Sequence, residues 1–144
     1  METGKRKILL SACLAGENVR FDGKIKNVLP NINELYEKYD VILVCPEVMG
    51  GLPVPRPQSE IKVGRVMNIE GKDVTENFRK GAEETLRLAK EHKVEFAILK
   101  QSSPSCGSKT VYNGNFEKIK IPGMGITAQL LSRNGIKVLS EDDV

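Results

Sequence analysis

Three cysteines are the side chains with the clearest capacity for chemistry in this sequence of 144 residues. They are Cys13, Cys45 and Cys106. The chain contains no other cysteine, and each of the three stands at or just beyond the end of a short apolar segment. A thiolate is a nucleophile and a soft metal ligand. If the fold gathers these three thiols, the sequence predicts either a metal site or thiol chemistry.

The segments that precede the cysteines each predict a buried strand. They are short, aliphatic or β-branched, and followed by Gly, Pro or Ser, which is typical of strands in a covered sheet. Their expected bounds are 7–12, 41–45 and 95–100. If these strands are parallel neighbours, their carboxyl ends share the edge at which open α/β sheets hold their sites. Strands lie ~4.8 Å apart, so three adjacent ends span roughly 10 Å.

Helical patterns separate the strands and indicate the fold class. One helix is expected to open at Asn31 and to continue to Tyr39, and two more are expected over 74–92 and 126–134. Asp73 and Glu76 have the spacing of a capping box at the start of the second helix. Strands that alternate with helices predict a parallel sheet covered by helices on both faces.

The expected architecture is therefore α/β, with three layers and a parallel sheet of about four strands in the order 2-1-3-4. The fourth strand is expected over 136–139, and small β-hairpins over 60–69 and around residues 113–114. The segment 46–60 is rich in Gly and Pro, which predicts a stiff, irregular loop of functional importance. By its length the whole chain, residues 1–144, is expected to form a single domain.

Composition excludes several classes of function. The net charge is only +3 and aromatic residues make up 5% of the chain, so a nucleic-acid partner is not expected. No segment approaches the ~20 apolar residues of a membrane span, and no secretory signal is recognisable. The odd number of cysteines indicates reduced thiols and a cytoplasmic location. Monomer and homodimer fit the sequence equally well.

The types and spacing of possible ligands favour an iron–sulfur cluster over zinc. A structural zinc site has four ligands, commonly in Cys-x-x-Cys pairs, and no such pair occurs. The single histidine, His92, lies near the end of a charged helix and is expected at the surface. Cys thiolates hold iron–sulfur clusters, and nearby helix N-termini are expected to favour the thiolate form. Two alternatives stay open at this point, namely unrelated buried cysteines or other thiol or metal chemistry.

Several motifs resemble the bacterial family named domain of unknown function 523, and together they cover nearly the whole chain. They are SACLAG at 11–16, NVRFDG at 18–23, VCPEVMGGLP at 44–53, PRP at 55–57, GKDVT at 71–75, SPSCG at 103–107 and RNGIK at 133–137. The sequence departs from the family pattern at two positions, with Phe21 in place of Tyr and Ser102 in place of a basic residue.

The resemblance implies a Rossmann-like α/β fold, because the family includes thiouracil desulfidases with that fold. In those enzymes three cysteines carry a [4Fe-4S] cluster that has one iron free of protein ligands. By the resemblance, a 2-thiouracil-like substrate loses its sulfur and gains oxygen from water, without net electron transfer.

The resemblance also implies individual roles. The family's cluster ligands fall on Cys13, Cys45 and Cys106, its acid/base carboxylate on Glu47, and its active-site serine on Ser103. A carboxylate beside a thiolate cluster is expected to have a raised pKa through like-charge repulsion. The alternative for Glu47 is that it caps backbone N–H groups of its loop, and the alternative for Ser103 is a turn residue bonded to its own backbone.

Two arginines in the loops expected around the cleft are candidate substrate ligands. Arg20 and Arg56 could each bind an anionic group, because a guanidinium matches a carboxylate or phosphate with two hydrogen bonds. Each could instead pair with a neighbouring carboxylate, for which the candidates are Asp22, Glu47 and Glu60.

The sequence thus predicts an iron–sulfur-dependent desulfidase that acts on a small thiolated pyrimidine and uses a [4Fe-4S] cofactor. Two other functions stay open, a non-catalytic metal- or sulfide-binding protein and a cluster-free thiol enzyme with one cysteine as nucleophile.

Overall fold

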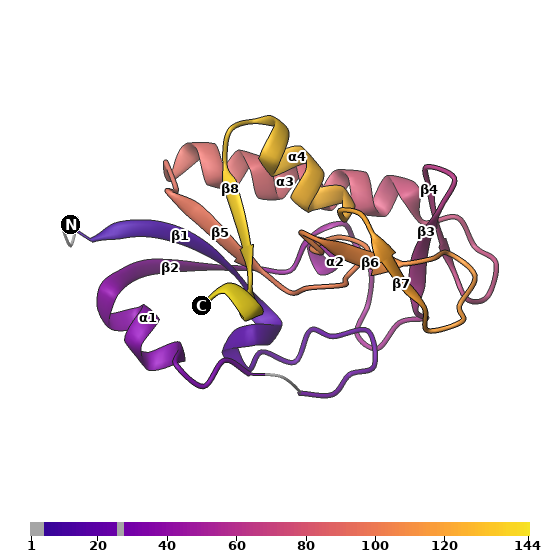
Figure 1. The fold of residues 1–144 in the computed structure, drawn as a ribbon, viewed down its shortest axis with the longest axis horizontal. Helices are drawn as coiled ribbons and strands as arrows, with labels where there is room; N and C mark the ends of the chain where they lie inside the picture. Colours follow the sequence, from indigo (N-terminus) through magenta and orange to yellow (C-terminus); the bar gives the residue numbers. More distant parts are fainter. Residues whose placement is uncertain (1–4, 26–27) are drawn as a thin grey trace.

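A four-stranded parallel sheet forms the centre of the molecule (Figure 1). The computed structural model describes residues 5–25 and 28–144. The sheet has the order β2-β1-β5-β8, which confirms the predicted order 2-1-3-4. Its strands are β1 (Arg6–Ser11), β2 (Tyr39–Val44), β5 (Phe96–Leu99) and β8 (Lys137–Ser140).

Helices cover both faces of this sheet and make the three expected layers (Figure 1). One face carries α1 (Ile32–Lys38), and the other carries α3 (Thr75–Glu91) and α4 (Ile126–Arg133). None of the helices in the described part of the chain is long and apolar enough to cross a membrane.

Alternation along the strands divides the apolar side chains between two cores. Ile8 and Leu10 belong to a cluster with Leu35 of α1, whereas Leu9 belongs to a cluster with Leu131 of α4. All five side chains are buried. Successive strand residues point to opposite faces, so strands covered on both faces read as continuous apolar runs. This explains why these strands could be predicted from the sequence.

Two antiparallel hairpins lie at one end of the molecule, on the right in Figure 1. The first pairs β3 (Ser59–Lys62) with β4 (Arg65–Asn68), and the second pairs β6 (Thr110–Tyr112) with β7 (Lys120–Pro122). Both were predicted from the sequence. They lie beyond the carboxyl ends of β1 and β2 and so can close a site formed there.

The structure corrects three local predictions. Tyr39 begins β2 and pairs with Arg6, because strand pairing outweighs the helical spacing of its side chain. Asp73 does not form a capping box; it precedes the N-cap residue of α3 and accepts the Thr75 backbone N–H at 2.9 Å. The segment 46–60 is not wholly irregular, since it contains the short helix α2 (Pro46–Met49) and the start of β3. A proline is compatible with the first position of a helix.

Helix α2 packs directly on α3 through a glycine. A Cβ atom at Gly81, within α3, would lie 1.8 Å from the Pro46 carbonyl oxygen, so no other residue fits there without a shift of α2. The Asn77 side chain donates a hydrogen bond of 2.9 Å to the Gly50 carbonyl at the far end of α2. A glycine inside a helix costs about 1 kcal/mol of stability relative to Ala. At position 81 this glycine allows α2 to pack against α3 at the edge of the sheet.

Candidate metal centre and active site

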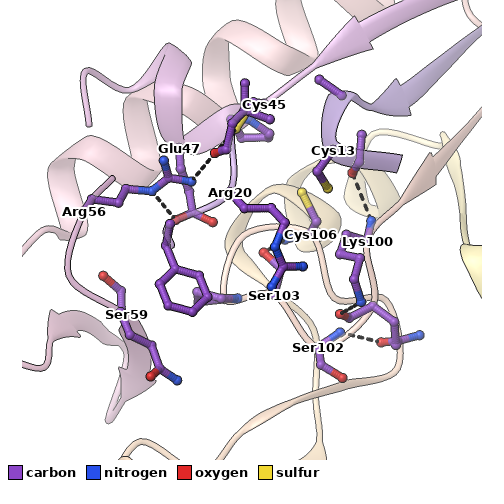
Figure 2. A pocket seen from close by; sticks show the side chains of 18 of the residues that line it. Cys13, Arg20, Cys45, Glu47, Arg56, Ser59, Lys100, Ser102, Ser103 and Cys106 are labelled. Atoms are coloured by element: carbon purple, nitrogen blue, oxygen red, sulfur yellow. Dashed lines mark hydrogen bonds and ion pairs between the residues drawn. The ribbon is translucent and has the colours of Figure 1, made fainter. Parts of the chain in front are cut away.

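A cavity of about 330 Å³ lies at the carboxyl ends of β1, β2 and β5, and all three cysteines line it. Cys13 lies in a 3-10 helix that follows β1, Cys45 directly precedes α2, and Cys106 lies in the loop between β5 and β6. Figure 2 shows the three side chains coming from three separate segments toward the same space. The strands therefore bring together thiols that are far apart in the sequence, as expected from their positions.

Burial dominates the electrostatics of these thiols. It is the largest cause that raises the pKa of Cys13, to about 11, and it raises the pKa values of Cys45 and Cys106 as well. The backbone N–H groups of Val48 and Glu47 at the start of α2 partly offset this at Cys45. The helix N-terminus thus favours the thiolate of Cys45, as the sequence predicted, but burial has the larger effect and the pKa is raised. A bound metal must displace the thiol protons.

The thiols interact with one another and have the character of an iron–sulfur ligand set. The charge of Cys45 raises the pKa values of both Cys13 and Cys106. Yet within residues 5–25 and 28–144 no group of three or more Cys, His, Asp or Glu side chains surrounds a single-ion position. A lone zinc requires sulfur atoms about 2.3 Å from one point. Thiolates hold polynuclear iron–sulfur clusters, and three cysteines that line one cavity fit that donor set.

A buried ion pair stands beside Cys45. The Arg56 Nε atom donates to Glu47 Oε1 at 3.1 Å, and the two side chains are 4% and 16% exposed. Arg56 also donates to the carbonyl oxygens of Pro53 at 3.0 Å and Val19 at 2.9 Å. Three of its nitrogen atoms are thus engaged within the protein, so the ion-pair alternative for Arg56 is the one that the structure shows (Figure 2).

Burial raises the pKa of the Glu47 carboxyl, and the further rise expected from repulsion by a thiolate cluster stays a prediction. Desolvation by burial is the largest cause, while Arg56 and a hydrogen bond from Ser103 act in the opposite direction. Its hydrogen-bond partners are two side chains, Arg56 and Ser103, rather than backbone N–H groups of its own loop.

Ser103 forms the turn predicted as its alternative and also bonds to Glu47. Its Oγ accepts the backbone N–H groups of Ser105 and Cys106, each at 3.1 Å, and the same hydroxyl bonds to Glu47. With two N–H donors on its oxygen, the hydroxyl proton is directed to the carboxylate. The serine therefore shapes the turn that carries Cys106 and orients Glu47 at the same time.

The start of α4 holds the Cys106 loop in place. The Thr127 backbone N–H donates to the Ser105 carbonyl at 2.8 Å, and the hydroxyl groups of these two residues are 2.7 Å apart. The Gly125 N–H donates to the Gly107 carbonyl at 2.8 Å. Ser105 and Thr127 are fully buried, so this loop is a fixed part of the core.

Two further cations of the cavity lie near Cys13. Arg20 extends across it in Figure 2, and its guanidinium lies 3.4 Å from Asp22, a long contact for an ion pair. Lys100 forms an ion pair of 2.6 Å with Glu141. Both cations act to lower the pKa of Cys13. Two cations, each paired with a carboxylate, thus lie next to Cys13.

Several lining residues were missed by the sequence reasoning. They are Gln58, Ser59, Lys100, Tyr112 and Lys120. Lys100 is the last residue of the strand predicted over 95–100 and directly follows β5, so the rule that identified the cysteines could have found it. Tyr112 and Lys120 reach the cavity through the placement of a hairpin, which no local pattern encodes. Ser102, one of the two departures from the family pattern, is buried in the lining and bonds to Thr110 Oγ1 at 2.9 Å.

Comparison with known proteins identifies the family. The family model described as 2-thiouracil desulfurase matches residues 8–143. The chain belongs to this family. It is 39% identical over 147 residues to the uncharacterized protein YbbK of Bacillus subtilis (strain 168), with 95% of this chain and 97% of that protein covered.

A solved structure resembles this fold throughout. It is the [4Fe-4S]-dependent thiouracil desulfidase TudS (DUF523Vcz), with a TM-score of 0.93 and 46% sequence identity. The match covers 97% of this chain and 93% of that chain. The α/β fold and the family that the sequence predicted are therefore confirmed.

Proposed function

We propose that this chain is an iron–sulfur-dependent desulfidase that removes sulfur from a thiolated pyrimidine such as 2-thiouracil. In the balanced reaction the C=S group and one water give C=O and hydrogen sulfide, with no net electron transfer. The observation that carries the proposal is one cavity lined by three cysteines, which follow three adjacent strands, together with Glu47 and Ser103. Family membership and 46% identity to a solved thiouracil desulfidase support it.

Cys13, Cys45 and Cys106 are the proposed cluster ligands. They are free thiols on three separate segments of the chain, and their donor set matches the thiolates that iron–sulfur clusters require. When bound, a [4Fe-4S] cluster held by three cysteines supplies one iron without a protein ligand, a Lewis acid with affinity for sulfur. The open interior of the cavity leaves room for a substrate beside these residues.

Glu47 is the proposed proton carrier. In this role its carboxyl accepts a proton from the attacking water and returns it to the departing sulfur. Arg56 fixes one carboxylate oxygen through the contact of 3.1 Å, and the Ser103 hydroxyl bonds to the same group. Because Arg56 is nearly fully buried and engaged with Glu47, we assign it to positioning this carboxylate rather than to direct contact with substrate.

Arg20 is the proposed substrate ligand among the cations of the cavity. Its contacts with Asp22 are long, at 3.4 Å for both nitrogen atoms, so a substrate oxygen could replace them at small cost. We further propose that the protein works in the cytoplasm, where reducing conditions keep three thiols available.

Anaerobic reconstitution and a substrate assay test the proposal together. The loaded protein is expected to contain about four irons per chain, as a cubane cluster requires, and to release sulfide from 2-thiouracil. Glu47→Gln is expected to keep its iron but to lose at least about 100-fold in rate, the share typical of general acid–base catalysis. Glu83→Gln, on the exposed face of α3, is the control with unchanged rate.

The other outcomes identify the alternatives. A loaded protein that binds 2-thiouracil or sulfide without turnover would be a binding protein. Sulfide release by an iron-free preparation would indicate a thiol enzyme. Loss of iron in Glu47→Gln would reassign Glu47 to a structural role.

A further inference from the structure

Glu60 is a buried carboxylate that the proposed reaction does not use. It lies on β3 and is 1% exposed. Its Oε1 accepts the backbone N–H groups of Gly114 at 2.9 Å and Phe116 at 3.2 Å. The Gln58 side chain donates to its Oε2 at 3.5 Å. One carboxylate thus joins the first hairpin to the turn of the second, through charge-assisted hydrogen bonds that are about twice as strong as neutral ones.

The turn of the second hairpin is built to fit against β3. Gly114 has φ +91°, in the left-handed region that favours glycine. A Cβ atom there would lie 2.6 Å from the Ile61 carbonyl oxygen, so the turn touches the backbone of β3. The Asn113 N–H closes the turn onto the Ile119 carbonyl at 2.9 Å. Contact and hydrogen bonds together fix the turn relative to the first hairpin.

This joint sets the position of one wall of the cavity. Tyr112 and Lys120 are register partners at the end of β6 and the start of β7, next to the turn that Glu60 holds, and both line the cavity. The Lys120 Nζ atom lies 6.0 Å from the centroid of the Tyr112 ring. Ser59, from the first hairpin, also lines the cavity. In Figure 2 it lies on the opposite side of the picture from Cys13. We call Gln58, Ser59, Tyr112 and Lys120 the hairpin wall.

We propose that Glu60 is a positioning residue for substrate binding, which holds the hairpin wall so that Tyr112 and Lys120 contact the part of the pyrimidine remote from its sulfur. This inference rests on the proposed function. A phenol ring offers an apolar face to a flat heterocycle and a hydroxyl to its polar edge. An ammonium group donates hydrogen bonds to a carbonyl oxygen. The wall therefore selects the ring, and the cysteine side of the cavity receives the sulfur.

Steady-state kinetics of the reconstituted protein with 2-thiouracil test the inference. Glu60→Ala frees the turn, so we expect KM to rise about tenfold while kcat stays within about threefold, the pattern of lost binding rather than lost chemistry. Glu60→Gln keeps a carbonyl oxygen for both N–H groups and is expected to keep KM within about threefold of the original chain. Glu83→Ala, on the exposed face of α3, is the control with unchanged constants.

Two further measurements separate this inference from the proposed function. Hydrogen exchange of the Gly114 and Phe116 amides is expected to accelerate in Glu60→Ala and needs no cluster. Iron content is expected to stay equal in all variants. If the original chain releases no sulfide, the proposed function fails, whereas an active chain whose KM is unchanged by Glu60→Ala overturns only the role of Glu60.

A variant outside the core keeps the test decisive if Glu60→Ala does not fold. Lys120 is exposed at the rim of the cavity, and Lys120→Ala removes its ammonium without disturbing Glu60. A rise of about tenfold in KM with constant kcat supports the wall as a binding surface. An unchanged KM in Lys120→Ala and in Tyr112→Ala overturns the inference.

Discussion

Replacement of Arg56 by Met offers a quantitative test of the buried ion pair. Met fills much of the space of the arginine stem but removes the hydrogen bonds to Glu47, Pro53 and Val19. Removing one partner of a buried pair costs about 3–5 kcal/mol, because the other charge is left uncompensated. Glu47 keeps 16% of its side chain exposed, so water offsets part of this loss and we expect the lower end, about 3 kcal/mol.

The carbonyl groups of Pro53 and Val19 add to this loss. Each loses a charged donor, and partial hydration limits the combined effect to about 1 kcal/mol. The total expected for Arg56→Met is therefore about 3–4 kcal/mol. In urea, where proteins of this size have slopes of about 1–3 kcal/mol per molar, the unfolding midpoint falls by about 2 M.

Urea unfolding of the apoprotein, followed by far-ultraviolet circular dichroism, measures this directly, since the chain has no Trp for fluorescence. Arg79→Met is the matched control, because Arg79 is 57% exposed in its pair with Glu76 and should lose at most about 0.5 kcal/mol. Glu47→Gln in the Arg56→Met background removes the stranded charge and should restore about 2 kcal/mol. A loss below about 1 kcal/mol, or no recovery in the double variant, would refute the reasoning.

Three further outcomes are expected. Gly81→Ala forces α2 away from α3, so we expect the free energy of unfolding to fall by about 1–3 kcal/mol. We also expect a lower iron content after reconstitution. Unchanged thermal unfolding and iron content would contradict the close packing. Ser103→Ala removes a hydroxyl that orients the Glu47 carboxylate, and kcat for sulfide release should fall about 10- to 100-fold at constant iron content, whereas an unchanged kcat would leave Ser103 as a turn residue only. Hydrogen bonds, chiefly from Thr75, lower the pKa of Asp73 from 3.8 to about 2. Its carboxylate therefore stabilises the fold above pH 3.8, and this stabilisation is lost as the pH falls through about 2. Asp73→Asn should therefore lower the urea midpoint at pH 7 and have a smaller effect at pH 2, and equal effects at both values would show that the charge does not matter.

The framework of the site could be predicted because strands buried on both faces are visible in the sequence. Each cysteine follows such a strand, and the alternation with helices implies that the strand ends share an edge. Two conclusions followed without coordinates, the strand order and the meeting of the thiols. The positions of Glu47 and Ser103 beside cysteines came from the family resemblance, and their mutual hydrogen bond is a result of the fold.

Other parts of the site had no local signal. A four-residue helix such as α2 is too short to show a period, and its proline resembles a loop signal although it is compatible with a helix start. Tyr39 continues the helical spacing of the preceding residues, but in the structure it pairs with Arg6 in the parallel sheet. Tyr112 and Lys120 line the cavity through the placement of the second hairpin, whose turn donates a hydrogen bond from Gly114 to Glu60, 54 residues earlier in the chain. Such contacts depend on tertiary placement, which periodicity does not contain.

The most direct test of the account is a crystal structure of the anaerobically reconstituted protein with anomalous diffraction at the iron edge. The account predicts one compact iron peak in the cavity, bonded to the Sγ atoms of Cys13, Cys45 and Cys106, with one iron facing the space lined by Glu47. An iron site elsewhere in the molecule, or a cluster in the cavity that leaves any of the three sulfur atoms unbound, would contradict it.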